Sequence, residues 1–201
     1  MVDPTRYYDL ERYLFDDVRP RFASEGSLGA FDFFSMVIWK ANRAKSKIAQ
    51  LLRRKDPDKR QALEPIVRDL TRSLHAALDD EARLKLLMAT WGFGLPMATA
   101  ILTVLWPENF TAYDVRVCEQ LEHFADLKNK TNFRQIWRGY CEYRQAVSAA
   151  VPGSQSLRDK DRYLWARSTA LQLERDIARG FAVEADLSPR RGPDSQLSHR
   201  G

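Results

Sequence analysis

The chain has 201 residues, is 44% hydrophobic and carries a formal net charge of +5. This length suits one compact unit or two small interlocked ones. No apolar run approaches the roughly 20 residues that a membrane-spanning helix needs, and the N-terminal residues lack a signal-peptide pattern. We therefore expect a cytoplasmic protein without membrane contact. Two cysteines, Cys118 and Cys141, are too few for a four-cysteine zinc or iron–sulfur site, so no metal and no cofactor are expected.

The positive charge is concentrated in residues 40–60. This segment holds nine Lys or Arg residues against Asp56 and Asp58, so it carries +7 and the remainder of the chain −2. A basic patch on a nearly neutral body is typical of proteins that bind polyanions. A solvated helix end is the commoner origin of such a run, and the patch alone leaves both interpretations open.

Apolar residues recur at helical spacing along the chain, and we expect an all-α fold. The first helix is predicted over residues 5–17. The second runs from about 30 to 52, with an apolar first half and a cationic second half. Further helices are predicted over 64–78, 81–91, 95–106, 114–127, 132–151 and 159–183. Asp159 and Asp161 are interpreted as capping acids of the last helix. Residues 184–201 contain prolines and little apolar material, which predicts a disordered tail.

The most specific pattern is WGFGLPMA, residues 91–98, between two predicted helices. Gly92 suits the left-handed conformation that closes a helix. Gly94 leaves room for the backbone to approach a phosphate, and free amides over residues 95–98 add the positive end of a helix dipole. Phe93 is expected to point inward and hold the loop. An ordinary corner between two helices also favours glycine, so this pattern alone does not decide its role.

Asp114 begins the next predicted helix, eighteen residues after Pro96. Aspartate is a favoured N-cap, which would explain the residue without any chemistry. A carboxylate that accepts backbone N–H bonds is also ionised and fixed in place. Cleavage of an N-glycosidic bond needs such an anion beneath the deoxyribose, because its transition state has oxocarbenium character.

Together these residues resemble the helix-hairpin-helix (HhH-GPD) superfamily of DNA glycosylases. Its signature is a Leu-Pro-Gly-Val-Gly-Pro-Lys-Thr-Ala-like hairpin, followed by a Val-Asp-Thr-His-Val-Arg-like segment that holds the catalytic Asp. Gly92, Phe93, Gly94 and Ala98 match the hairpin in register, and residues 113–117 match the later segment. The matching motifs cover about a fifth of the chain. The order of predicted helices is compatible with the family over residues 30–127.

The resemblance implies an HhH-GPD-like helical bundle with two interlocked lobes and a cleft between them. One lobe would comprise residues 30–127, and the other residues 1–29 with 128–183. The chain would bind double-stranded DNA as a nucleoid-associated monomer. It would cleave the N-glycosidic bond of a flipped damaged or modified base, with Asp114 assisting the attack of water and an abasic site as the product. The role would be DNA repair or defence against modified foreign DNA.

Two features depart from the bifunctional and iron–sulfur branches of this family. Pro96 occupies the position of the lysine that forms a Schiff base in bifunctional members, and proline has no amine. The cysteines of the iron–sulfur branch are missing. The resemblance therefore implies a compact, monofunctional glycosylase without lyase activity.

The same resemblance suggests which residues contact DNA. The hairpin contacts would come from Gly92, Phe93, Gly94 and Pro96. Further contacts would come from the second predicted helix, just after its apolar half: Lys40, Asn42, Arg43, Lys45 and Lys47. Lys40 would contact a phosphate, and Asn42 and Arg43 would enter the gap left by the flipped base. Trp39 and Tyr113 are the preferred walls of the base pocket, ahead of Tyr7, Tyr8 and Trp165. Snorkelling cations and core aromatic residues would produce the same patterns without any function.

Two other functions remain open at this point. A non-catalytic helix-hairpin-helix module would bind DNA through the same hairpin, with Asp114 as a cap only. A helical adaptor would use the basic patch to bind an acidic protein partner, and it would show no salt-sensitive affinity for DNA. The sequence does not identify the base that a glycosylase would release.

Overall fold

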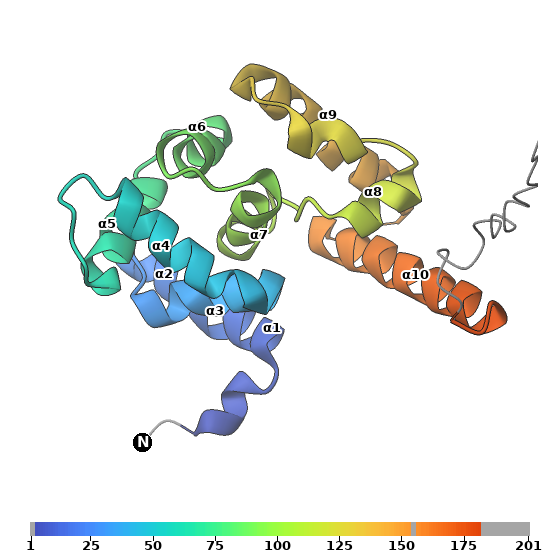
Figure 1. Ribbon diagram of the computed structural model, residues 1–201, viewed down its shortest axis with the longest axis horizontal. Coiled ribbons are helices and arrows are strands. Elements are labelled where there is room, and N and C mark those ends of the chain that lie inside the picture. The colour runs from blue at the N-terminus through green and yellow to red at the C-terminus, as the bar shows by residue number, and fades with distance from the viewer. Residues whose placement is uncertain (1–2, 154–155, 182–201) are drawn as a thin grey trace, which may run out of the picture.

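The structure is a computed structural model that describes residues 3–153 and 156–181 (Figure 1). Within these ranges the chain folds into helices and forms no strand, which confirms the predicted all-α class. Each helix in the described ranges is too short or too polar to cross a bilayer. The predicted disordered tail, residues 184–201, lies outside the described residues.

The helices form two groups, joined by segment 106–114, which turns at residues 107–109 and is then extended as far as Asp114 (Figure 1). The N-terminal group contains η1 (Pro4–Tyr7), α1 (Leu10–Tyr13), η2 (Leu14–Val18), α2 (Arg19–Glu25), α3 (Ala30–Ala41), η3 (Asn42–Ala44), α4 (Lys45–Lys55), α5 (Leu63–His75), α6 (Asp80–Lys85), η4 (Leu86–Thr90) and α7 (Leu95–Leu105). The C-terminal group contains α8 (Val115–Leu121), η5 (Ala125–Asn129), α9 (Phe133–Ala150) and α10 (Leu157–Ala178). Here η1, η3 and η5 are 3₁₀ turns, whereas η2 and η4 are π-helical turns.

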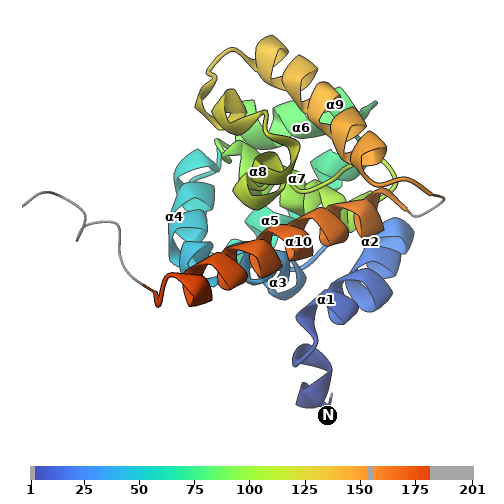
Figure 2. The same cartoon turned by 90° about the vertical axis from the view of Figure 1, so that its right-hand side faces the viewer.

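The division into two groups falls elsewhere than the expected lobe boundaries. Helices α1 and α2 pack against α3 and α7, so they belong with the hairpin helices and not with the C-terminal ones. Helix α8 packs along α10 and against α9 (Figure 2). The C-terminal group begins at α8 because segment 106–114 carries the chain away from α7 before α8 starts.

The second predicted helix is interrupted, and this is the main local difference from the expected elements. Ala41, the last residue of α3, has φ −162° and ψ 91°, and the chain turns through η3 before α4 starts. The break lets α4 bury Ile48 and Leu52 against α5 while its cations stay outside. The helix predicted over residues 114–127 is also shorter, because Glu122 and Phe124 adopt left-handed conformations with φ 55° and 74°.

Helix α7 lies in the centre of the core. Apart from Pro96, every residue of this helix is buried. It contacts α2, α3 and α6 of its own group. The hairpin loop at its N-terminus is therefore attached to the most deeply buried helix of the chain.

Candidate active site

The hairpin loop between η4 and α7 closes as the sequence predicted. Gly92 has φ +77°, and its amide donates to the Met88 carbonyl at 3.1 Å while the Phe93 amide donates to the Leu87 carbonyl at 2.9 Å. The Phe93 side chain is buried, with its ring edge-on to that of Phe33 at 6.2 Å between centroids. Phe93 thus holds the loop from inside and offers no surface for direct contact with a ligand.

Gly94 is not required by the backbone conformation of the loop. Its φ of −70° and ψ of 153° are open to any residue. An added Cβ would meet only the Cδ of Pro96, at 3.9 Å. The absence of a side chain at position 94 leaves the loop backbone uncovered.

Fewer amides are free at this loop than the sequence suggested. Pro96 has no amide proton, and the amides of Met97 and Ala98 already donate to the Gly94 carbonyl at 3.1 and 3.0 Å. The amides of Gly94 and Leu95 donate no hydrogen bond within the described chain. These two amides, rather than those of residues 95–98 as a whole, remain for an anion.

The end of the basic helix α4 lies beside the hairpin. A Cβ on Gly92 would stand 3.2 Å from the Lys55 Cε and 3.9 Å from its Nζ. The neighbouring side chains of Arg53 and Arg54 are also exposed. The fold therefore brings part of the basic segment 40–60 to the loop whose backbone is uncovered.

Two cations of the basic segment have other partners. Arg60 forms ion pairs with Asp56 at 2.7 Å, Asp58 at 3.6 Å and Asp69 at 2.7 Å, and it ties the loop after α4 to α5. Lys40 was expected on a phosphate, but its Nζ lies 2.6 Å from the Oδ2 of Asp114.

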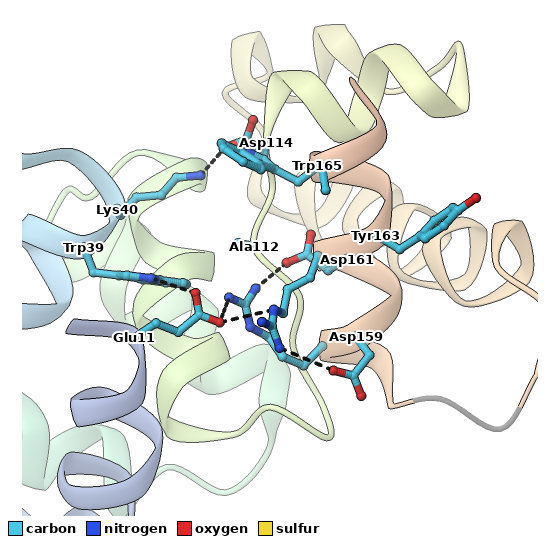
Figure 3. Close-up of a pocket in the computed structure, with 12 residues that line it drawn as sticks. Glu11, Trp39, Lys40, Ala112, Asp114, Asp159, Asp161, Tyr163 and Trp165 are labelled. Carbon is cyan, nitrogen blue, oxygen red and sulfur yellow. Dashed lines mark hydrogen bonds and ion pairs between the residues drawn. The ribbon is translucent and has the colours of Figure 1, made fainter. Parts of the chain in front are cut away.

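Asp114 is held on both carboxylate oxygens. Its Oδ1 accepts the Arg116 amide at 3.0 Å as the N-cap of α8, and its Oδ2 accepts from Lys40 (Figure 3). The side chains of Asp114 and Lys40 are 21% and 15% exposed, so the pair is partly buried yet open to solvent on one side. The carboxylate is fixed in place and remains accessible.

Helix α9 fixes the backbone that leads to Asp114. The Tyr140 hydroxyl donates to the Thr111 carbonyl at 2.8 Å and accepts the Thr111 amide at 3.0 Å. The Tyr143 hydroxyl donates to the Ala112 carbonyl at 3.0 Å. Burial raises the pKa of both phenols, so they remain neutral donors.

Tyr113 has a structural position rather than an open one. Its amide donates to the Thr99 hydroxyl of α7 at 2.9 Å, and its own hydroxyl donates to the carbonyls of Phe124 and Ala125 at 2.7 and 3.2 Å. The side chain is buried and does not line the larger pocket, although it borders a smaller hollow next to Asp114. Thr99 links the position of Asp114 to the hairpin helix.

A pocket of about 800 Å³ opens between the two groups of helices (Figure 3). It falls within the range of small-molecule sites, roughly 300–1,000 Å³. Its walls come from α1, the end of α3, the extended segment and the first half of α10. The lining residues are Glu11, Trp39, Lys40, Ala112, Asp114, Arg158, Asp159, Asp161, Arg162, Tyr163, Trp165 and Ala166.

A second hollow of about 210 Å³ extends from the same ion pair toward the hairpin. It includes Lys40 and Asp114 and reaches Pro96, in the first turn of α7. The Asp114 carboxylate thus borders both the large pocket and the approach to the hairpin loop.

Trp39 forms one wall of the large pocket, as the sequence predicted for a base pocket. Its Nε1 donates to the Glu11 carboxylate at 3.4 Å, and the Arg158 guanidinium lies over its ring at 5.0 Å. Trp165 and Tyr163 also line the pocket, and they are 45% and 54% exposed. Trp39 is therefore the aromatic wall with the firmest support.

Asp161 is a pocket residue that the sequence interpretation missed. The N-cap of α10 is Ser156, and Asp161 is a buried group whose Oδ2 accepts from Arg158 at 2.7 Å. Burial raises the pKa of Asp161 to about 6. The sequence spacing indicates this inward position. Asp161 follows Leu157 by four residues and precedes Leu164 by three, so the three residues share one face of the helix.

The remaining predicted DNA contacts lie at the helix break that follows Trp39 and Lys40. Asn42, Arg43, Lys45 and Lys47 are all exposed there, and the Lys45 ammonium donates to the Asn42 side chain at 2.8 Å. The break places these side chains at a turn rather than along a continuous helix, and none of the four lines the pocket.

The donor set of the site is one of carboxylates, amines and aromatic rings. Within residues 3–153 and 156–181, no cluster of three or more His, Cys, Asp or Glu side chains could hold a metal ion.

Comparisons of the chain with protein-family models, with curated proteins and with solved structures gave no match. The geometry of this pocket and of the hairpin beside it is therefore the basis for a functional assignment.

Proposed function

We propose that the protein is a monofunctional DNA N-glycosylase, which releases a flipped base by Asp114-assisted attack of water. The main support is the position of Asp114. Its carboxylate is held by the Arg116 amide and by Lys40, and it borders both a pocket large enough for a base and the approach to the hairpin. A fixed anion at this point stabilises the positive charge that develops on the sugar during bond cleavage.

The hairpin would hold the backbone of the nucleotide. The Gly94 and Leu95 amides donate no hydrogen bond within the described chain, and the Lys55 ammonium lies beside Gly92 of the same loop. Free amides and an ammonium at one loop suit a phosphate. The base would rotate out of the stack into the large pocket and lie against Trp39. The sugar would then stand over Asp114, and the attacking water would reach C1′ beside it.

A non-catalytic DNA-binding module is the second candidate. One observation favours it: the cap of α8 and the ion pair with Lys40 give Asp114 a complete structural role. Such a module would bind undamaged duplex through the hairpin and would release no base. The two functions therefore differ in a product that is simple to detect.

The test is a panel of duplexes containing uracil, hypoxanthine, 8-oxoguanine or 7-methylguanine, together with phage genomic DNA rich in modified cytosines. Alkali-labile abasic sites are scored after incubation with the wild-type protein and with Asp114→Asn. Asparagine is also a good N-cap, so this variant should fold. We expect abasic sites with the wild type only, and equal DNA binding by both proteins. Salt-sensitive binding without abasic product on any substrate would favour the non-catalytic module.

A further inference from the structure

We propose that Asp161 is a second catalytic carboxylate, which gives a proton to the departing base. This inference rests on the proposed glycosylase activity and adds a residue to its mechanism. When the N-glycosidic bond breaks, its electron pair moves to the base nitrogen. The proton of the Asp161 carboxyl neutralises that nitrogen, while the water oxygen bonds to C1′ and its proton passes to Asp114. Solvent then takes the proton from Asp114 and restores the proton of Asp161.

The position of Asp161 suits this role. It lies on α10, across the pocket from Trp39 and Lys40 of α3 (Figure 3). Its side chain is 6% exposed. The Oδ2 atom accepts from Arg158 at 2.7 Å, and the Oδ1 atom has no hydrogen-bond partner within the described chain. One carboxyl oxygen is thus oriented by the protein and the other is left for a ligand.

A buried hydroxyl beside Asp161 also lacks a partner. The Oγ1 atom of Thr111 is fully buried and makes no hydrogen bond among the described residues. The hydroxyl acts as a weak donor toward the Asp161 carboxyl and lowers its pKa. Unpaired buried hydroxyls are uncommon in folded proteins.

The charges around Asp161 come from several elements and leave it partly protonated near neutral pH. Burial is the largest influence and raises its pKa, and the nearby Asp114 carboxylate raises it further. Arg158 on the same helix and Lys40 on α3 lower it. Tyr140 and Tyr143 on α9 are neutral phenols with raised pKa values. The net pKa of about 6 suits a proton donor, because general acids act best when their pKa lies near the working pH.

The experiment measures single-turnover base release between pH 5 and 9, on a substrate identified by the panel of modified duplexes. In the wild type, the rate should fall as the pH rises through about 6, because Asp161 then loses its proton. Asp161→Asn should release base roughly 100-fold more slowly at pH 6 and lose this pH dependence. The control is Asp176→Asn, the same change on the same helix but away from the pocket, which should match the wild type.

A second variant keeps the test decisive if Asp161→Asn fails to fold. Arg158→Gln removes a charge that lowers the pKa of Asp161 and retains hydrogen-bond donors. In this variant, the fall in the rate of base release with rising pH (the alkaline limb of the profile) should therefore occur at higher pH. If Asp161 only orients Arg158, base release should be slower at every pH, and the pH at which the rate falls should not change.

The outcomes separate this inference from the proposed function. Equal rates and pH profiles for the wild type and Asp161→Asn overturn the role of Asp161, while base release that depends on Asp114 would stand. A uniform loss of rate, with the alkaline limb unchanged in both pocket variants, also overturns it. Absence of base release by the wild type on every substrate overturns the glycosylase proposal, and the proton-donor role with it.

Discussion

The Nζ of Lys40 lies 2.6 Å from the Oδ2 of Asp114, and this ion pair joins the end of α3 to the start of α8. The two residues are 74 positions apart, and their ion pair connects the two groups of helices. Both line the large pocket. Lys40 therefore orients the proposed catalytic carboxylate instead of standing on the basic surface with Lys55.

Lys40→Gln and Lys55→Gln should separate orientation from DNA binding. The first removes the partner of Asp114, and base release should fall roughly tenfold or more, since one oxygen of the carboxylate is no longer held. Its DNA affinity should show an unchanged salt dependence. Lys55→Gln should lower the slope of log K against log salt by about 1, the effect of one lost phosphate contact. Fluorescence anisotropy with duplex DNA at several salt concentrations measures both slopes. A reduced slope for Lys40→Gln would place its ammonium on a phosphate.

The two hairpin glycines should respond differently to alanine. Gly94→Ala should leave stability within about 0.5 kcal/mol, because its φ of −70° is ordinary and the added Cβ makes only a van der Waals contact with Pro96. It should still weaken DNA binding, because the methyl group covers the loop backbone. Gly92→Ala should cost about 1 kcal/mol or more, because φ is +77° there. Urea unfolding and anisotropy on both variants test this. Undiminished DNA affinity in Gly94→Ala would argue against a phosphate at this loop.

Borohydride should trap no covalent adduct between the protein and DNA. Pro96 has no amine, and Lys40, which lines the pocket, is paired with Asp114. The reaction is run with the wild type on a substrate that yields abasic sites, and the products are separated on a denaturing gel. An adduct that disappears in Lys40→Arg would show that Lys40 acts as a nucleophile, and the protein would then have lyase activity.

Local patterns in the sequence predicted the parts of the fold that short-range chemistry determines. The turn at Gly92, the buried Phe93 and the N-cap at Asp114 follow from backbone preferences and apolar spacing, and all three are present. The break after Ala41 was not predicted, since it depends on how α4 packs on α5 and no Gly or Pro marks it. The partner of Asp114 was missed for a similar reason, because a contact over 74 positions leaves no local trace.

Asp161 is a second residue whose position the local sequence pattern did not predict. An acid near the start of a helix is usually a cap, and the sequence analysis interpreted Asp161 in that way. The real cap is Ser156, five residues earlier. Only the arrangement of α10 against the rest of the chain turns Asp161 into a buried pocket residue, although its spacing from Leu157 and Leu164 indicated the inward face.

Thr99→Val tests whether α7 positions Asp114 through the backbone. The Thr99 hydroxyl accepts the buried amide of Tyr113 at 2.9 Å, and valine has the same shape without the hydroxyl. The variant leaves that amide unsatisfied, so stability should fall by about 1–3 kcal/mol. Base release should fall as well, because Asp114 follows directly. Thr103→Val is the control, since the Thr103 hydroxyl donates only within α7. Equal effects of the two variants on base release would refute the positioning role of Thr99.

Asp56 should make stability depend on acidic pH. Hydrogen bonds from Arg60 hold the pKa of Asp56 below its usual 3.8. A carboxyl whose pKa is lowered in the folded state stabilises the fold above its unfolded pKa, and this contribution is lost as pH falls through the folded value. Asp56→Asn should therefore be less stable than the wild type at pH 7, and the difference should shrink below about pH 4. Asp58→Asn, whose exposed side chain is 3.6 Å from Arg60, should show little change at either pH. Thermal unfolding across this range measures the difference, and a gap that persists at low pH would mean that packing, not charge, explains the loss.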